Sequence, residues 1–230
     1  MTTALTLHSP VHELLDTHHA TWKRVGDGMI ALHFGKPDAE QQAAKALGLC
    51  DLSALTKLGL KGRGAADVLR SAGITPPPNR YDTASLQDGG LIIRTDTNEF
   101  LLEEGVTGST VAKLLRELRQ SPKADPLLVE RTDAAFVLTG SRANEVLRQT
   151  CGMNFSDTTA APLNRLVMSR IAAVSCAILP TLDGPTPRFR LWLDPSFAIS
   201  LWESLEEIVH DLGGHVVGAA ATATNISSAK

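Results

Sequence analysis

The sequence is poor in cysteine, has no long apolar run and has no long run of basic residues. Its three cysteines, Cys50, Cys151 and Cys176, are odd in number, far apart and without a C-x-x-C pair. This pattern argues against a disulfide framework or a zinc site and suits a reducing compartment. No apolar stretch approaches roughly 18 residues, and the N-terminal segment MTTALTLHSP lacks the features of a signal peptide. We therefore expect a cytoplasmic protein with no membrane partner.

The charge balance and the missing motifs exclude several classes of function. The net charge is −3, from 22 basic and 25 acidic residues, so a nucleic-acid partner is not indicated. The sequence contains no Walker motif and no G-x-S-x-G nucleophile elbow. Gly62 and Gly64 do not begin a dinucleotide fingerprint, because Asp67 stands where the third glycine would be. Motifs alone therefore reveal no active site.

Two further groups of polar residues are expected to be solvated. The adjacent acids at 103–104 and 206–207 must point in different directions, so neither pair forms a catalytic dyad, and we expect both on the surface. His8 and His12 have the i, i+4 spacing of metal ligands but no acidic third ligand on the same face. A solvated helix end is the better interpretation of the histidines, and we expect no metal.

One pattern occurs twice in the sequence. The segments 60–70 and 138–148 both fit L-x-G-x-x-A-x-x-V-L-R, with six identities at a constant offset of 78 positions. Each copy follows a short apolar run and leads into apolar positions at helical spacing, which predicts a strand, a tight turn and a helix. Gly62 and Gly140 occupy the turn, where a positive φ or a close backbone approach favours a residue without Cβ. We interpret the two copies as an internal duplication.

The remaining patterns complete two similar units. The first unit has predicted strands at 29–34, 55–60, 91–93 and 100–102 and predicted helices at 37–47, 60–70 and 109–118. The second has predicted strands at 135–138, 165–179 and 189–193 and predicted helices at 138–150 and 195–212. We expect an α+β fold of two pseudo-repeated strand-helix-strand-strand-helix units, with domains at 1–120 and 127–214 and a flexible tail at 215–230. A ligand would lie in the cleft between the units.

The stretch 29–69, MIALHFGKPDAEQQAAKALGLCDLSALTKLGLKGRGAADVL, resembles the opening of the glycine cleavage T-protein (aminomethyltransferase) family. That family begins with a strand ending in H-[YF]-G, an E-H-x-A-type helix, a D-[VL]-S-x-[ML] strand and then L-x-G. The resemblance continues through 88–102, 132–147, 188–195 and 201–208, so it covers nearly the whole chain. It implies a T-protein-like, duplicated α+β fold around a tetrahydrofolate pocket.

Several polar groups of the family's pocket have no counterpart here. Where the family carries its catalytic aspartate after a double glycine, this sequence has Ile93 or Arg94. The family's pterin-gripping glutamate falls at Arg190, and a guanidinium cannot accept hydrogen bonds from a pterin's amino and ring N–H groups. The family's G-A-R-D segment resembles 218–221, Gly-Ala-Ala-Ala, without its charges. The resemblance also implies that the family's C-terminal barrel is lacking.

These departures are similar to those of the gamma subunit of heterotetrameric sarcosine oxidase. The resemblance therefore implies a non-catalytic, folate-related subunit of one-carbon metabolism, with larger oxidase or one-carbon enzyme subunits as partners. Leu55, Tyr81, Phe189 and Arg190 fall at or near the family's pocket positions and are the candidate tetrahydrofolate-binding residues. No catalytic residue is assigned.

Two alternatives stay open. An active tetrahydrofolate-dependent aminomethyltransferase would need another acid, and Asp88, Asp96 and Glu99 are the near candidates, although solvation in turns explains all three. A stand-alone folate binder would use the apolar candidates as a surface for the pteridine ring. The tail and the region of Trp192 and Trp202 are candidate partner contacts, but burial in the core is the better interpretation of both tryptophans.

Overall fold

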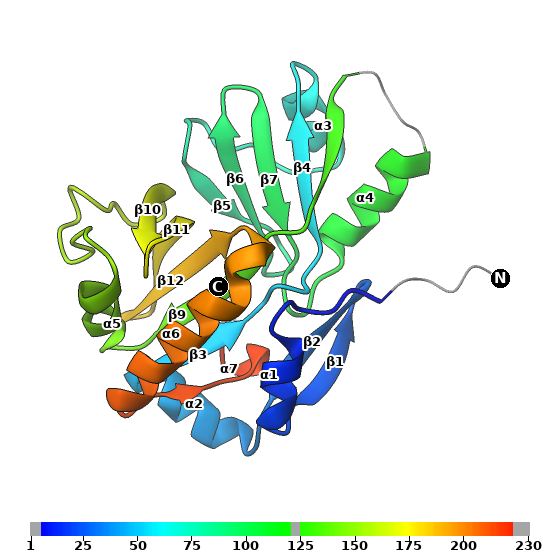
Figure 1. The fold of residues 1–230 in the computed structure, drawn as a ribbon. Coiled ribbons are helices and arrows are strands. Elements are labelled where there is room, and N and C mark those ends of the chain that lie inside the picture. Colours follow the sequence, from blue (N-terminus) through cyan, green and yellow to red (C-terminus); the bar gives the residue numbers. More distant parts are fainter. Residues whose placement is uncertain (1–5, 121–124, 223–230) are drawn as a thin grey trace.

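The computed structural model describes residues 6–120 and 125–222, which form an α+β fold with three sheets (Figure 1). In chain order the elements are α1 (His12–Thr17), β1 (Thr21–Val25), β2 (Gly28–His33), α2 (Pro37–Ala46), β3 (Gly48–Asp51), β4 (Lys57–Lys61), α3 (Ala65–Ser71), β5 (Thr83–Ser85), β6 (Leu91–Asp96), β7 (Glu99–Glu103), α4 (Thr110–Gln120), β8 (Leu127–Arg131), β9 (Ala134–Thr139), α5 (Ala143–Thr150), β10 (Val167–Ile171), β11 (Val174–Asp183), β12 (Thr186–Leu193), the 3₁₀ helix η1 (Pro195–Phe197), α6 (Ala198–Asp211), β13 (His215–Val216) and α7 (Ala219–Thr222). The predicted α+β class is confirmed. None of the helices in these ranges is long and apolar enough to cross a membrane.

The two large sheets have corresponding strand orders. The five-stranded sheet runs β5-β6-β7-β4-β8, and the six-stranded sheet runs β10-β11-β12-β9-β3-β13. In each sheet a hairpin, β6-β7 or β11-β12, lies beside the strand that precedes the glycine turn, β4 or β9. Helices α3 and α4 accompany the first sheet, and α5 and α6 accompany the second (Figure 1).

Each large sheet also contains a strand from the other part of the chain. β3 precedes β4 in sequence but pairs with β9, whereas β8 precedes β9 but pairs with β4. The predicted boundaries, 1–120 and 127–214, therefore do not coincide with the sheets. The local patterns that suggested those boundaries carry no information about which distant strand becomes the neighbour.

The interval 165–179 was predicted as one strand and is instead a hairpin. β10 and β11 pair in antiparallel register, with Ile171 opposite Val174. The turn between them consists of Ala172 and Ala173, which have positive φ values of 46° and 68°. Two-residue hairpins favour such dihedrals because they match the strand twist, and they usually recruit glycine or asparagine. Because alanine is not a typical residue of such a turn, the sequence did not indicate it.

Both repeated glycines have the geometry that the sequence predicted. Gly62 has φ +137° and Gly140 has φ +117°. A Cβ at Gly62 would lie 1.9 Å from Asp125 Oδ1, and one at Gly140 would lie 2.4 Å from the carbonyl oxygen of Ala46. Both the dihedral and the close contact therefore require glycine at the two strand-to-helix turns.

The segment after Gly214 is ordered as far as Thr222, so the expectation of a frayed tail from His215 is wrong for that part. The backbone N–H groups of His215 and Val217 donate to Leu47 and Leu49 at 3.2 and 2.9 Å, which adds β13 to the six-stranded sheet. Val217 and Ala219 are buried. The small, polar character of the tail as a whole suggested fraying, but its first part contains the small apolar residues Val217 and Ala219, which are buried where α7 packs against β2 and α2. Residues 223–230 of the predicted tail lie outside the described residues.

The cores follow the two faces of each sheet. Outward-facing strand residues pack under the helices, as Leu58 and Phe100 do in the first sheet and Phe136 and Leu191 do in the second. The inward-facing side chains meet in a separate inner core, which contains Ile93, Leu101, Ala135, Leu166, Leu179 and Trp192. Trp192 and Trp202 are both buried, which confirms their interpretation as core residues.

Substitution of either repeated glycine should destabilise the fold. We expect Gly140→Ala and Gly62→Ala each to cost about 2 to 4 kcal/mol in unfolding free energy, because a Cβ meets occupied space at an unfavourable φ. Gly35→Ala is the matched control, since no atom lies within 4 Å of its added Cβ. Chemical denaturation measures all three. Equal stability of the Gly140 and Gly35 variants would contradict the role assigned to the turn.

Candidate functional site

A buried carboxylate lies where the two large sheets meet. Glu103 ends β7, is fully buried, and lies opposite Lys57 of β4 in the ladder. Its Oε2 accepts a 2.7 Å hydrogen bond from Nε1 of Trp192 and lies 3.8 Å from Nζ of Lys57. Its Oε1 forms an ion pair with Nη2 of Arg190. Glu103 thus interacts with side chains from both large sheets.

Lys57 and Asp51 extend this charged group within the same interior. Nζ of Lys57 donates to the carbonyl oxygens of Ser53 and Leu55 at 2.8 and 3.2 Å. Burial lowers the pKa of Lys57, and the nearby Glu103 carboxylate opposes that shift. Burial raises the pKa of Asp51, and the hydrogen bonds from Ser53 oppose that shift. Buried charges of both signs therefore stabilise one another in place of water.

Strand alternation decides which side chains of β12 reach this interior. Phe189 and Leu191 belong to the helix-covered core, whereas Arg190 and Trp192 face the inner side. The guanidinium carbon of Arg190 lies 5.9 Å from the centroid of the Trp192 ring, so the cation also contacts an aromatic face. Arg190 is therefore held by a carboxylate and a ring at once.

The structure brings only part of the predicted folate-binding set together. Tyr81 packs against the inner core of Trp192, the residue that Arg190 contacts. Leu55 is buried in a different cluster with Cys50, Leu52 and Val137. Phe189 points to the helix-covered face, where its ring packs edge to face on Phe155 with centroids 5.3 Å apart. Tyr81 and Arg190 are thus the candidates that border one interior.

Ile93 and Arg94, which the sequence resemblance aligns with a catalytic aspartate, already have partners. Ile93 is fully buried in the inner core. The neighbouring guanidinium of Arg94 donates to the carbonyl oxygens of Pro78 and Thr97 at 2.5 and 2.6 Å. Neither side chain offers a carboxylate for acid–base chemistry.

The expectation that Glu103 and Glu104 lie on the surface is wrong, because both side chains are buried. They do point in different directions, as adjacent strand residues must. Glu104 accepts from the backbone N–H groups of Val111 and Ala112 at 3.3 and 2.7 Å. Burial raises the pKa of Glu104, and these hydrogen bonds from the first turn of α4 oppose that shift. The signal that sequence reasoning missed is that Glu103 follows three large apolar residues in one strand.

Asp88, the first alternative catalytic acid, caps the same helix. Its Oδ2 accepts from the backbone N–H groups of Ser109 and Thr110 at 3.0 and 2.8 Å. Together, Asp88 and Glu104 satisfy N–H groups that a helix N-terminus leaves without internal partners. The other two candidates make surface ion pairs: Asp96 with Arg80 at 3.8 Å, and Glu99 with Lys61 at 3.3 Å. These contacts account for all three acids without chemistry.

Within 6–120 and 125–222, no group of three or more histidine, cysteine or acidic side chains could hold a metal ion. His8 and His12 instead face each other, with 3.4 Å between their Nδ1 atoms. The imidazole rings make an edge contact, and that of His12 also packs on Trp22. These contacts describe a local aromatic arrangement at the start of α1.

Removal of the Glu103 carboxylate should destabilise the protein strongly. We expect Glu103→Ala to cost about 3 to 5 kcal/mol, because it leaves Lys57 and Arg190 buried without their acid. Glu99→Ala is the matched control, since Glu99 pairs with Lys61 on the same two strands but near solvent, where a pair is worth about 0 to 1 kcal/mol. Denaturant unfolding of both variants checks the difference. Similar losses of unfolding free energy in the two variants would show that the buried ion pair contributes no more to stability than the exposed one.

The cap at α4 should make stability depend on acid pH. Burial alone would raise the pKa of Asp88, but the hydrogen bonds from Thr110, Ser109 and Gly90 outweigh it and lower the pKa. A lowered folded pKa means that the stabilisation is complete above the unfolded value of about 3.9 and is lost as pH falls through the folded value. We expect Asp88→Ala to lose about 1 kcal/mol at neutral pH and to show a shallower decline below about pH 4.

Asp96→Ala is the control for this pH series, because Asp96 is an exposed acid at the end of β6. Thermal unfolding from pH 7 down to pH 2 compares it with the Asp88 variant and the native sequence. A parallel decline of all three curves would contradict the cap.

The fold has clear counterparts among solved structures. Glycine cleavage system aminomethyltransferase T from Bartonella henselae matches with a TM-score of 0.66 and 18% identity over 94% of this chain, which spans 60% of that protein. A chain of heterotetrameric sarcosine oxidase from Corynebacterium sp. U-96 matches with a TM-score of 0.60 and 19% identity, covering 90% of this chain and 96% of that one. By sequence, no protein-family model and no curated protein matches. The chain therefore has the fold of these two proteins, as its resemblance to the T-protein family predicted.

Proposed function

We propose that the protein is a T-protein-like, folate-related subunit without catalytic activity of its own, similar to the gamma subunit of sarcosine oxidase. The observation that carries the proposal is the filled interior between the two sheets. There Arg190, at the position of the family's pterin-gripping glutamate, forms an ion pair with the buried Glu103. The match to nearly the full length of a sarcosine oxidase chain supports the same assignment.

The chemistry of this interior is unfavourable for a pterin. The amino and ring N–H groups of a pterin need acceptors, and a carboxylate usually supplies them. Glu103 is the buried acid nearest to the expected position, but its oxygens already interact with Trp192, Lys57 and Arg190. Tetrahydrofolate would have to separate this ion pair before it could bind. We infer that the chain has lost tight folate binding and keeps the fold for its surfaces.

The internal repeat supports a common origin with duplicated T-proteins. The repeated pattern at 60–70 and 138–148 begins in β4 and β9, and each of these strands is the fourth in its sheet, beside a hairpin. We infer that the two sheets descend from one duplicated unit. The interior around Glu103 then corresponds to the ligand site between the units.

The proposed partners are the larger subunits of an oxidase or of another one-carbon enzyme. This inference rests on the heterotetrameric assembly of the sarcosine oxidase relative. In such an assembly the chemistry belongs to other chains, and this chain would contribute to assembly.

Calorimetric titration tests the loss of folate binding. We expect no measurable heat when tetrahydrofolate or its 5-formyl derivative is added to the purified chain. Arg190→Glu should not restore binding, because it sets a second carboxylate against Glu103 and therefore destabilises the interior. Micromolar or tighter binding by the native chain, about −8 kcal/mol, would favour a stand-alone folate binder or an active aminomethyltransferase.

Isolation of the native complex tests the subunit assignment. Isolated from its native cell without overexpression, the 24.5 kDa chain should elute from a sizing column in stoichiometric amounts with larger chains. Elution as a free monomer would overturn the assignment, whatever the titration shows.

A further inference from the structure

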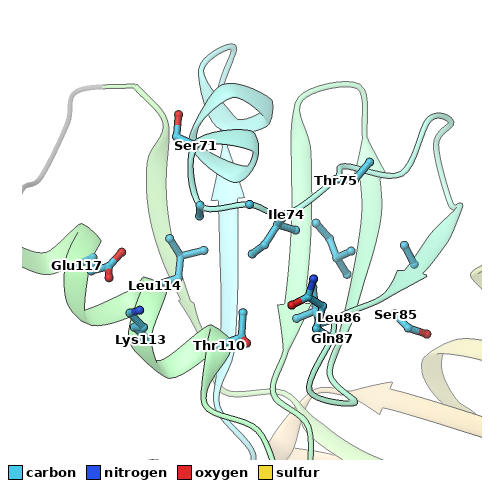
Figure 2. A pocket seen from close by; sticks show the side chains of 14 residues that line it. Ser71, Ile74, Thr75, Ser85, Leu86, Gln87, Thr110, Lys113, Leu114 and Glu117 are labelled. Carbon is cyan, nitrogen blue, oxygen red and sulfur yellow. The ribbon is translucent and has the colours of Figure 1, made fainter. Parts of the chain in front are cut away.

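A cavity of about 620 Å³ lies on the helix side of the five-stranded sheet, away from the interior that contains Glu103. It opens between the end of α3, the β5-β6 edge and the first three turns of α4 (Figure 2). Apolar side chains form part of its wall, and they are Ile74, Leu86, Ile92 and Leu114. Its volume is within the usual range of small-molecule sites, about 300 to 1,000 Å³.

In the six-stranded sheet, aromatic side chains fill the corresponding space between the sheet and its helices. There Trp202 of α6 packs on Phe136 with centroids 5.2 Å apart, and Phe155 packs on Phe189 at 5.3 Å. In the buried cluster of the five-stranded sheet, Phe100 is the one aromatic side chain among the described residues, and α4 supplies leucines. The fold can therefore fill the space between sheet and helices. The cavity exists because the side chains at this place in the five-stranded sheet are smaller.

The cavity has one cation and one anion in its lining. Lys113 and Glu117 stand on neighbouring turns of α4 (Figure 2). The lysine precedes the glutamate, which is the weaker order for an i, i+4 pair, and no ion pair joins them. Among the described residues neither side chain has a hydrogen-bonding or ionic partner, whereas Arg119 of the same helix pairs with Glu130 at 2.8 Å.

The other polar groups of the lining are neutral. Serine, threonine and glutamine side chains surround the opening, and they are Ser71, Thr75, Ser85, Gln87 and Thr110. In Figure 2 the side chains of Ile74 and Leu114 turn toward the space between α3 and α4. The cavity thus combines an apolar wall, a neutral polar rim and two opposite charges on one side.

We propose that this cavity binds an α-amino acid that has an apolar side chain. The ligand's carboxylate pairs with Lys113, its ammonium pairs with Glu117, and its side chain lies against Ile74, Leu86 and Leu114. A simple organic anion would gain the lysine but would lie near the glutamate without compensation, and a simple amine would have the opposite disadvantage. A zwitterion satisfies both groups. This site is separate from the proposed folate-related interior, so each can fail independently of the other.

A matched set of three probes tests the charge assignment. Calorimetry should show that L-phenylalanine binds the purified chain saturably, at about millimolar concentration. 3-Phenylpropanoate lacks the ammonium and 2-phenylethylamine lacks the carboxylate, and we expect each to bind about 10-fold more weakly. Equal affinities for the three probes would overturn the proposal, as would the absence of saturable binding by L-phenylalanine up to about 10 mM.

Two substitutions then assign the charges to residues. Lys113→Gln should weaken phenylalanine and phenylpropanoate but not phenylethylamine, and Glu117→Gln should weaken phenylalanine and phenylethylamine but not phenylpropanoate. Arg116→Gln is the matched control, because Arg116 is an exposed cation of the same helix that does not line the cavity. An effect of the Arg116 variant as large as that of the Lys113 variant would show that only the general charge of α4 matters, which overturns the site.

Filling the cavity tests its location. Ala84 of β5 lines the cavity and is only partly buried, so Ala84→Trp should occupy the space and abolish binding of all three probes. Unchanged phenylalanine binding by this variant, with an unfolding temperature like that of the native chain, would place the ligand elsewhere. If the variant does not fold, the Lys113 and Glu117 series decides.

Discussion

The arrangement of the two sheets depends on the interactions that the buried carboxylate of Glu103 makes with both of them. It is buried at the end of β7 and receives Lys57 from its own sheet and Trp192 and Arg190 from the other. An uncompensated charge there would be very unfavourable, so the two sheets must meet with these groups in register. The apolar inner core around Ile93, Leu101 and Leu179 supplies burial energy, but burial alone is non-directional. The ionic group supplies the directional constraint.

The same ionic interactions around Glu103 occupy the pocket that was predicted between the two sheets. A site between two sheets can hold a ligand only if its polar groups are free to meet that ligand. Here those groups interact with one another, and Ile93 adds apolar volume beside them in the inner core. On the outer side of the first sheet the situation is reversed, since space remains and Lys113 and Glu117 have no partner within 6–120 and 125–222. Within one fold, the polar groups of the inner side interact with one another, whereas an open cavity lies on the outer side.

Local features of the fold could be predicted from sequence, and non-local features could not. The strand-glycine-helix turns at Gly62 and Gly140 were predictable because a dihedral and a close contact depend on neighbouring residues. The exchange of β3 and β8 was not, because the choice between distant partner strands leaves no trace in either strand's own pattern. The burial of Glu103 depends on the same distant pairing. That Phe189 and Arg190 face opposite sides of the sheet was predictable, because adjacent residues of a strand point in opposite directions.

The exchanged strands also govern how this chain can acquire its structure during synthesis. β4 needs β8 as a neighbour, while β3, which is made before β4, has no antiparallel partner until β9 exists. An emerging chain that ends near residue 130 therefore has a complete five-stranded sheet but leaves β3 with exposed backbone groups. Such long-range pairing slows the formation of the six-stranded sheet. The six-stranded sheet therefore cannot be completed until the chain beyond β8 has been made, whereas every strand of the five-stranded sheet lies between residues 57 and 131.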